Sequence, residues 1–179
     1  MSTSPSSFEI DLKRVRDDAR RNIEQGPVTE GYNADRETVL KLLNDSLATE
    51  LVCVLRYKRH YFMAKGIASE SVAAEFAQHA AEEQDHADKL AARIVQLGGE
   101  PDFAPQTLAQ RSHSEYREGT DLKDMIRENL VAERIAIESY RAIIRYLGDS
   151  DTTTRRIFEE ILAVEEEHAD DMTDLLDSN

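Results

Sequence analysis

Glutamates occupy core positions in four long amphipathic segments of this 179-residue chain. In each segment apolar residues recur every three or four positions, which is typical of a helix with one buried face. The first such face consists of Leu40, Leu43, Leu47, Glu50, Val54, Tyr57 and Tyr61. The carboxylates that interrupt the four faces are Glu50, Glu83, Glu133 and Glu165. The sequence therefore predicts four acidic side chains at the centre of one helical bundle.

Carboxylates in a protein interior need a compensating positive charge. Burying an ionised carboxylate costs several kcal/mol even after relaxation, and four of them also repel one another. The four apolar faces contain no Arg or Lys near the level of the glutamates. Two divalent cations would balance four negative charges, so we expect a dinuclear metal site.

Histidines follow two of the glutamates at a spacing that suits a metal ion. Glu83 precedes His86 by three residues, and Glu165 precedes His168 by three. Residues three apart project from the same face of a helix, so each pair can bind one ion between them. The two Glu-x-x-His pairs are therefore predicted metal ligands together with the two lone glutamates.

An internal repeat relates the two halves of the chain. Tyr57 follows Glu50 by seven residues, and Tyr140 follows Glu133 by the same interval. The lone glutamate precedes its Glu-x-x-His pair by 33 residues in the first half and by 32 in the second. Two hairpins related by a pseudo-twofold axis would then each supply one Glu and one Glu-x-x-His, a ligand set of dinuclear carboxylate bundles.

Four long helices must position these residues, and their capping signals set their limits. Short turns join the first helix to the second and the third to the fourth, so each pair is antiparallel. A long crossover, with room for a short helix over residues 106–116, links the two pairs. We expect an all-α four-helix bundle over residues 35–179, with helices at 35–65, 69–97, 121–147 and 151–177.

Residues 1–34 are predicted to form an extension outside the bundle domain. Residues 1–7 are small and polar and are expected to be a disordered lead without an export signal. Apolar residues then recur at helical spacing from Phe8 to Ile23, which predicts a short amphipathic helix that ends near Gly26.

Composition narrows the classes of function. Asp and Glu total 36 against 22 Lys and Arg, for a net charge of −14, which disfavours nucleic-acid binding. The single cysteine, Cys53, excludes intrachain disulfides and paired-cysteine zinc or rubredoxin sites. No stretch approaches the 18 apolar residues of a membrane span. We expect a cytoplasmic protein without membrane association.

From about residue 35 to 177 the sequence resembles the ferritin-like superfamily, and its ligand pattern is most similar to that of bacterioferritins. The resemblance implies two irons within one subunit, with Mn or Zn as substitutes. Glu50, Glu83 and His86 would serve one ion, with Glu133, Glu165 and His168 at the other, and Glu83 and Glu165 would bridge. These six residues would form the catalytic ferroxidase centre.

The residues around that centre carry further implications of the resemblance. Tyr57 matches a redox-active tyrosine of bacterioferritins, but as core aromatics bonded to carboxylates Tyr57 and Tyr140 need no redox role. His79, one turn before Glu83, is either a further metal ligand on the access route or a histidine that supports the ligands. Gln84 stands where bacterioferritins have their haem-binding methionine, so no haem is expected.

The family pattern also bears on assembly and activity. Only 11 residues follow His168, too few for the fifth helix of 24-subunit shells, which favours a Dps-like homo-oligomeric cage of twelve subunits. The resemblance implies oxidation of Fe(II) by O2 or H2O2 and storage of the product. A di-iron or di-manganese peroxidase or catalase without storage is the alternative, and a Dps-like DNA-protecting protein is the weaker one.

Overall fold

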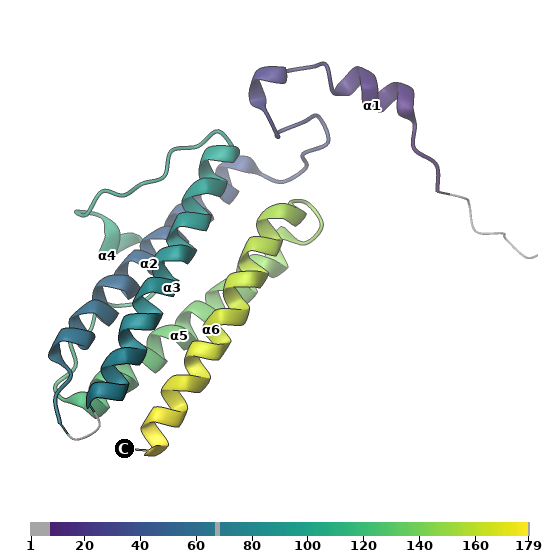
Figure 1. Ribbon diagram of the computed structural model, residues 1–179. Helices are drawn as coiled ribbons and strands as arrows, with labels where there is room; N and C mark the ends of the chain where they lie inside the picture. Colours follow the sequence, from purple (N-terminus) through teal and green to yellow (C-terminus); the bar gives the residue numbers. More distant parts are fainter. Residues whose placement is uncertain (1–7, 67–68, 179) are drawn as a thin grey trace, which may run out of the picture.

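The computed structural model describes residues 8–66 and 69–178, and helices make up almost all of its regular structure (Figure 1). The expected all-α bundle of two antiparallel hairpins is confirmed. In the first hairpin α2 packs against α3, and in the second α5 packs against α6. The long helices lie within two residues of their predicted limits: α2 (Arg36–Met63), α3 (Ser69–Gln96), α5 (Leu122–Leu147) and α6 (Thr152–Ser178).

The crossover between the hairpins follows α2 along its length and includes the short α4 (Leu108–Arg111). The backbone N–H of Asp102 donates to Asn44 Oδ1 at 2.8 Å, and that of His113 donates to Thr49 Oγ1 at 2.9 Å. Farther along, His60 Nε2 lies 3.1 Å from the carbonyl oxygen of Glu118. These bonds carry the chain to the opposite end of the bundle, where α5 begins.

Buried polar bonds fix the start of α6 against α3. Asp151 Oδ1 accepts from the backbone N–H of Thr154 at 2.9 Å, a typical cap for the free amides of a first helical turn. Arg93 of α3 donates to the same carboxylate at 2.9 Å and to Thr154 Oγ1 at 2.8 Å. This network joins the hairpins at one end of the bundle and so helps to fix their register.

Two separate apolar clusters enclose the middle of the bundle. The larger contains the buried residues Val39, Leu43, Leu47, Ala87, Leu90, Ile94, Leu97, Ala136, Tyr140, Ile143, Leu147, Phe158 and Ile161. The smaller contains Tyr57, Val72, Phe76, Ala80, Met125, Ile126 and Met172. The four glutamates lie between these clusters along the helices, so apolar packing closes both ends of the polar level.

The structure corrects two details of the sequence analysis. The N-terminal helix is shorter than predicted: α1 spans only Leu12–Asp18, a 3-10 turn covers Ile23–Gln25, and neither buries a residue. Figure 1 shows α1 away from the bundle, where Phe8 is 90% exposed, because no neighbouring helix covers its apolar side. Tyr61, predicted to lie on the buried face, is 40% exposed because α2 ends two residues later.

Two further expectations concern the N-terminal lead and membrane association. The predicted disordered lead, residues 1–7, lies outside the described residues. Among the helices of the described part, none combines the length and apolar character needed to cross a membrane.

Candidate metal centre

Each long helix contributes one buried glutamate to a common centre. Glu50 from α2, Glu83 from α3, Glu133 from α5 and Glu165 from α6 are all at most 1% exposed. The candidate ligand atoms form two overlapping groups, and within each group all atoms lie within 4.8 Å of one another. The groups are Glu50, Glu83, His86 and Glu165, and Glu83, Glu133, Glu165 and His168. Glu83 and Glu165 belong to both.

The two histidines face carboxylates from opposite sides of the centre. His86 Nδ1 lies 3.0 Å from Glu165 Oε1 and 3.3 Å from Glu83 Oε2, and Glu50 Oε2 is 3.6 Å away. His168 Nδ1 lies 3.5 Å from Glu165 Oε2 and 3.6 Å from Glu83 Oε1. The structure thus brings together all six residues that the sequence analysis selected.

Two tyrosines cross between the hairpins and hold the lone glutamates. Tyr57 of α2 donates to Glu133 of α5, and Tyr140 of α5 donates to Glu50 of α2. Both tyrosines are fully buried. Each hydroxyl satisfies one carboxylate oxygen and leaves the second free to bind a cation, a typical way to orient a ligand.

Burial and mutual repulsion shift the protonation of the centre. Burial, and then the charge of Glu83, raise the pKa of Glu50 to about 8. Burial alone would lower the pKa of His86, but contacts with Glu165 and two further carboxylates outweigh it and raise that pKa to about 12. For His168 burial is outweighed in the same way, and its pKa also rises to about 12. In the metal-free chain, protons therefore supply the positive charge that the glutamates require.

Several ligand atoms at the centre are buried without a hydrogen-bond partner among the described residues. They are Glu83 Oε1, Glu133 Oε2, both carboxylate oxygens of Glu165 and His168 Nδ1. Unpaired buried polar atoms are uncommon in folded proteins and each is costly. Carboxylate oxygens and imidazole nitrogens are ligands that divalent first-row metals accept. The donor set therefore fits a pair of such ions.

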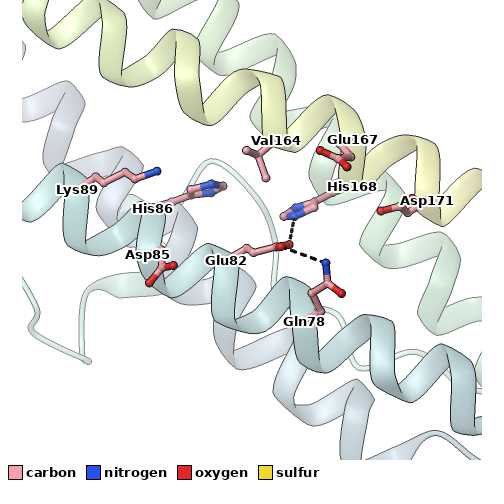
Figure 2. A pocket seen from close by; sticks show the side chains of 9 residues that line it. All are labelled: Gln78, Glu82, Asp85, His86, Lys89, Val164, Glu167, His168 and Asp171. Carbon is pink, nitrogen blue, oxygen red and sulfur yellow. Dashed lines mark hydrogen bonds and ion pairs between the residues drawn. The ribbon is translucent and has the colours of Figure 1, made fainter.

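A cavity of about 190 Å³ between α3 and α6 leads to the centre (Figure 2). Both His86 and His168 line it, together with the acidic Asp85 and Glu82. Glu82 Oε2 lies 2.8 Å from His168 Nε2, and a dashed line marks this contact in Figure 2. Sequence analysis missed Glu82 because it lies outside the apolar face, although its position directly before Glu83 could have indicated it.

His79 lies beside the centre and is fully buried. Its ring stacks on that of His168 with 3.9 Å between ring centroids, and its Nδ1 lies 3.1 Å from the Tyr57 hydroxyl. Through Tyr57 it is connected to Glu133. Burial, with the nearby charge of His168, lowers the pKa of His79 to about 4.

A buried cation also lies close to the centre, contrary to the sequence analysis. Arg56 is fully buried directly before Tyr57, where its guanidinium lies 5.6 Å from the tyrosine ring centroid. It donates to Asn129 Oδ1 at 2.9 Å and to Cys53 Sγ at 3.3 Å. The apolar periodicity did not predict a buried arginine because Arg56 lies at the edge of the buried face. No ion pair joins it to the four glutamates in the described part of the chain.

Comparisons with known proteins agree with this architecture. Residues 40–178 match the ferritin-like domain family. The bacterioferritin of Brucella melitensis is 34% identical over 142 residues, which cover 78% of this chain and 83% of that protein. The bacterioferritin of Mycobacterium avium is 32% identical over 133 residues, 74% of this chain and 79% of that protein.

Solved structures show the same fold. The bacterioferritin-related protein from Bacteroides fragilis, described as a dodecameric thioferritin, superposes with a TM-score of 0.79 at 32% identity, covering 82% of this chain and 88% of that one. Dps from Thermosynechococcus elongatus gives a TM-score of 0.75 at 21% identity, covering 78% and 90%, a similarity of fold alone. With a family match over most of its length and a bacterioferritin relative above 30% identity, the chain belongs to the ferritin-like family.

Proposed function

We propose that this protein stores iron, and that it first oxidises Fe(II) at the centre formed by Glu50, Glu83, His86, Glu133, Glu165 and His168. The observation that carries the proposal is the burial of four carboxylates around ligand atoms that lack hydrogen-bond partners among the described residues. The relatives named bacterioferritin support iron as the cargo. A pair of iron ions bound there would supply the electrons that reduce O2 or H2O2.

The protein's own residues prepare the centre for this chemistry. Glu83 and Glu165 belong to both groups of candidate ligand atoms, so they would help to hold both ions. Tyr57 and Tyr140 orient the lone glutamates, and the apolar clusters keep bulk water from both ends. Acidic residues along the cavity between α3 and α6 attract cations toward His86 and His168.

Assembly into a hollow homo-oligomer of twelve chains completes the proposal. The bacterioferritin-related protein from Bacteroides fragilis is dodecameric and is 32% identical to this chain, which supports the same arrangement here. The single cysteine, buried and unpaired, suits a reducing cytoplasm, which we propose as the location.

The test is rapid mixing of metal-free protein with Fe(II), followed by O2 or by H2O2. We expect saturable oxidation with two Fe(II) consumed per chain, and loss of at least about 100-fold in rate when Glu50→Ala and Glu133→Ala are combined. A matched control replaces the exposed Glu37 and Glu138 of the same two helices by Ala and should oxidise Fe(II) normally. Equal rates in the two double variants would contradict the proposal.

Native mass on the same samples separates storage from the alternative enzyme. A hollow particle of twelve chains, each of 20.3 kDa, that retains ferric iron after oxidation supports storage. A dimer or hexamer that decomposes peroxide rapidly and retains no iron would instead indicate a peroxidase or catalase.

A further inference from the structure

A second group of ligand-type side chains lies outside the six residues of the centre. Glu75 and His79 are one turn apart on α3, and Asp171 faces them from α6. His79 Nε2 lies 3.3 Å from Glu75 Oε1 and 3.4 Å from Asp171 Oδ2. All three candidate ligand atoms are within 4.8 Å of one another.

The hydrogen bonds of His79 determine which ring nitrogen carries its proton. The Tyr57 hydroxyl has one hydrogen and donates it to Glu133, so its oxygen can only accept from His79. His79 Nδ1, 3.1 Å from that oxygen, is therefore the protonated nitrogen of the neutral ring. The lone pair of Nε2 then points toward two carboxylates.

That geometry favours a bound cation. His79 is 0% exposed, and its Nε2 makes no hydrogen bond to any described residue. A lone pair held between two carboxylate oxygens is repelled by both, and the Nε2 atom itself is buried from solvent. A metal ion would bond to all three groups at once, and hydrogen bonding of the opposite ring nitrogen is the usual support for a metal-binding histidine.

We propose that Glu75, His79 and Asp171 bind a third cation, a divalent transition metal ion such as Zn²⁺, Co²⁺ or Fe²⁺. The imidazole selects such ions over Ca²⁺ and Mg²⁺, which prefer oxygen alone. The side chains of Glu75 and Asp171 are 32% and 42% exposed, so water completes the coordination and the ion can exchange. The site concerns binding only and does not depend on iron oxidation.

The proposed site lies next to the route into the centre. Asp171 also lines the cavity of Figure 2, as does Glu82. Glu82 forms a further group of candidate ligand atoms with His79 and His168. An ion that leaves the third site therefore meets the next carboxylate and then a histidine of the centre.

The experiment counts ions. Metal-free full-length protein is titrated with Co²⁺ and followed by calorimetry and by visible absorption. We expect three ions per chain in the unmodified protein and two after Glu75→Gln with Asp171→Asn. A control that removes the same charge from the exposed sides of the same helices, Asp88→Asn with Glu160→Gln, should retain three. Two ions in the unmodified protein, or three in the Glu75/Asp171 variant, would overturn the proposal.

A Zn²⁺-soaked crystal and one further variant complete the test. Anomalous density among Glu75, His79 and Asp171 supports the site, whereas density only beside Glu82 overturns it. In the variant with Glu50→Ala, which leaves the bond between Tyr57 and Glu133 intact, the third ion should persist. A protein that fails to oxidise Fe(II) but still binds this ion would refute the proposed function and leave the third site standing.

Discussion

The two hairpins supply the same ligands to the centre but surround them differently. Each provides one lone glutamate, one Glu-x-x-His pair and one tyrosine seven residues after the lone glutamate. The tyrosines cross, so that each hairpin orients the lone glutamate of the other. The predicted cation ligands are thus the residues that the two hairpins have in common, and neither hairpin can form the centre alone.

The surroundings break this symmetry at equivalent positions. Four residues before the Glu-x-x-His glutamate, the first hairpin has the buried His79, while the second has Ile161 in the larger apolar cluster. One residue before it, the first has Glu82, which contacts His168, and the second has Val164. At these two positions the first hairpin is therefore polar beside the centre and the second is apolar, and the cavity between α3 and α6 has Glu82 on one wall and Val164 on the other.

The largest predicted effect is the pH dependence of metal binding at the six ligands that the two hairpins share. The pKa values of His86 and His168, both about 12, mean that each ring carries a proton at neutral pH that a metal ion must displace. Each displaced proton adds one logarithmic unit of affinity per pH unit, and Glu50, whose pKa is about 8, must also lose a proton, so Zn²⁺ affinity should rise at least about 100-fold per unit between pH 6 and 8. Calorimetry in buffers of different ionisation enthalpy measures the protons released.

Single substitutions show whether the two rings contribute equally. His86→Asn and His168→Asn should each reduce proton release by one and make the rise of affinity with pH about tenfold less steep per unit. Release that falls in one variant alone would mean that the two halves of the centre titrate differently. Affinity that does not change with pH would contradict protonation of the rings.

The next effect compares the two shared glutamates. Because Glu83 and Glu165 each belong to both ligand groups, Glu83→Ala and Glu165→Ala should each slow Fe(II) oxidation by at least about 100-fold and disturb both ions. Glu50→Ala or Glu133→Ala should weaken mainly one. Stopped-flow rates together with Zn²⁺ stoichiometry distinguish the pairs, and loss of one ion only in Glu83→Ala would show that this residue does not bridge.

The sequence predicted the symmetric features of the molecule better than the asymmetric ones. Helical periodicity located the four long helices, and each glutamate stood out because it replaced an apolar residue. Arg56, Glu75 and Asp171 gave no such signal, since charged residues at the edge of a face look like solvated surface. The surroundings of these residues depend on how the crossover and α6 pack against α2 and α3. The spacing of residues within one helix does not predict that packing.

A smaller effect concerns the buried arginine, which the first hairpin has where the second has Ser139. Arg56→Met removes the hydrogen bond to Asn129 and leaves that amide oxygen buried with fewer partners. We expect the free energy of unfolding to fall by about 1–3 kcal/mol. Because a positive charge near Glu133 is lost, affinity for Zn²⁺ should increase. Arg141→Met, on the exposed side of α5, should change either quantity by less than about 0.5 kcal/mol.

The smallest effect separates the two tyrosines. Tyr57→Phe and Tyr140→Phe each remove one bond to a lone glutamate, and each should cost about 1 kcal/mol in stability and about tenfold in Zn²⁺ affinity. Tyr57 also accepts from His79, whereas the ring of Tyr140 packs against Phe158. Tyr57→Phe should therefore additionally weaken the third Co²⁺ site, because His79 loses the partner that holds its proton on Nδ1, and Tyr140→Phe should leave that site unchanged. Equal loss of the third ion in both variants would mean that the polar surroundings of the first hairpin do not set it apart from the second.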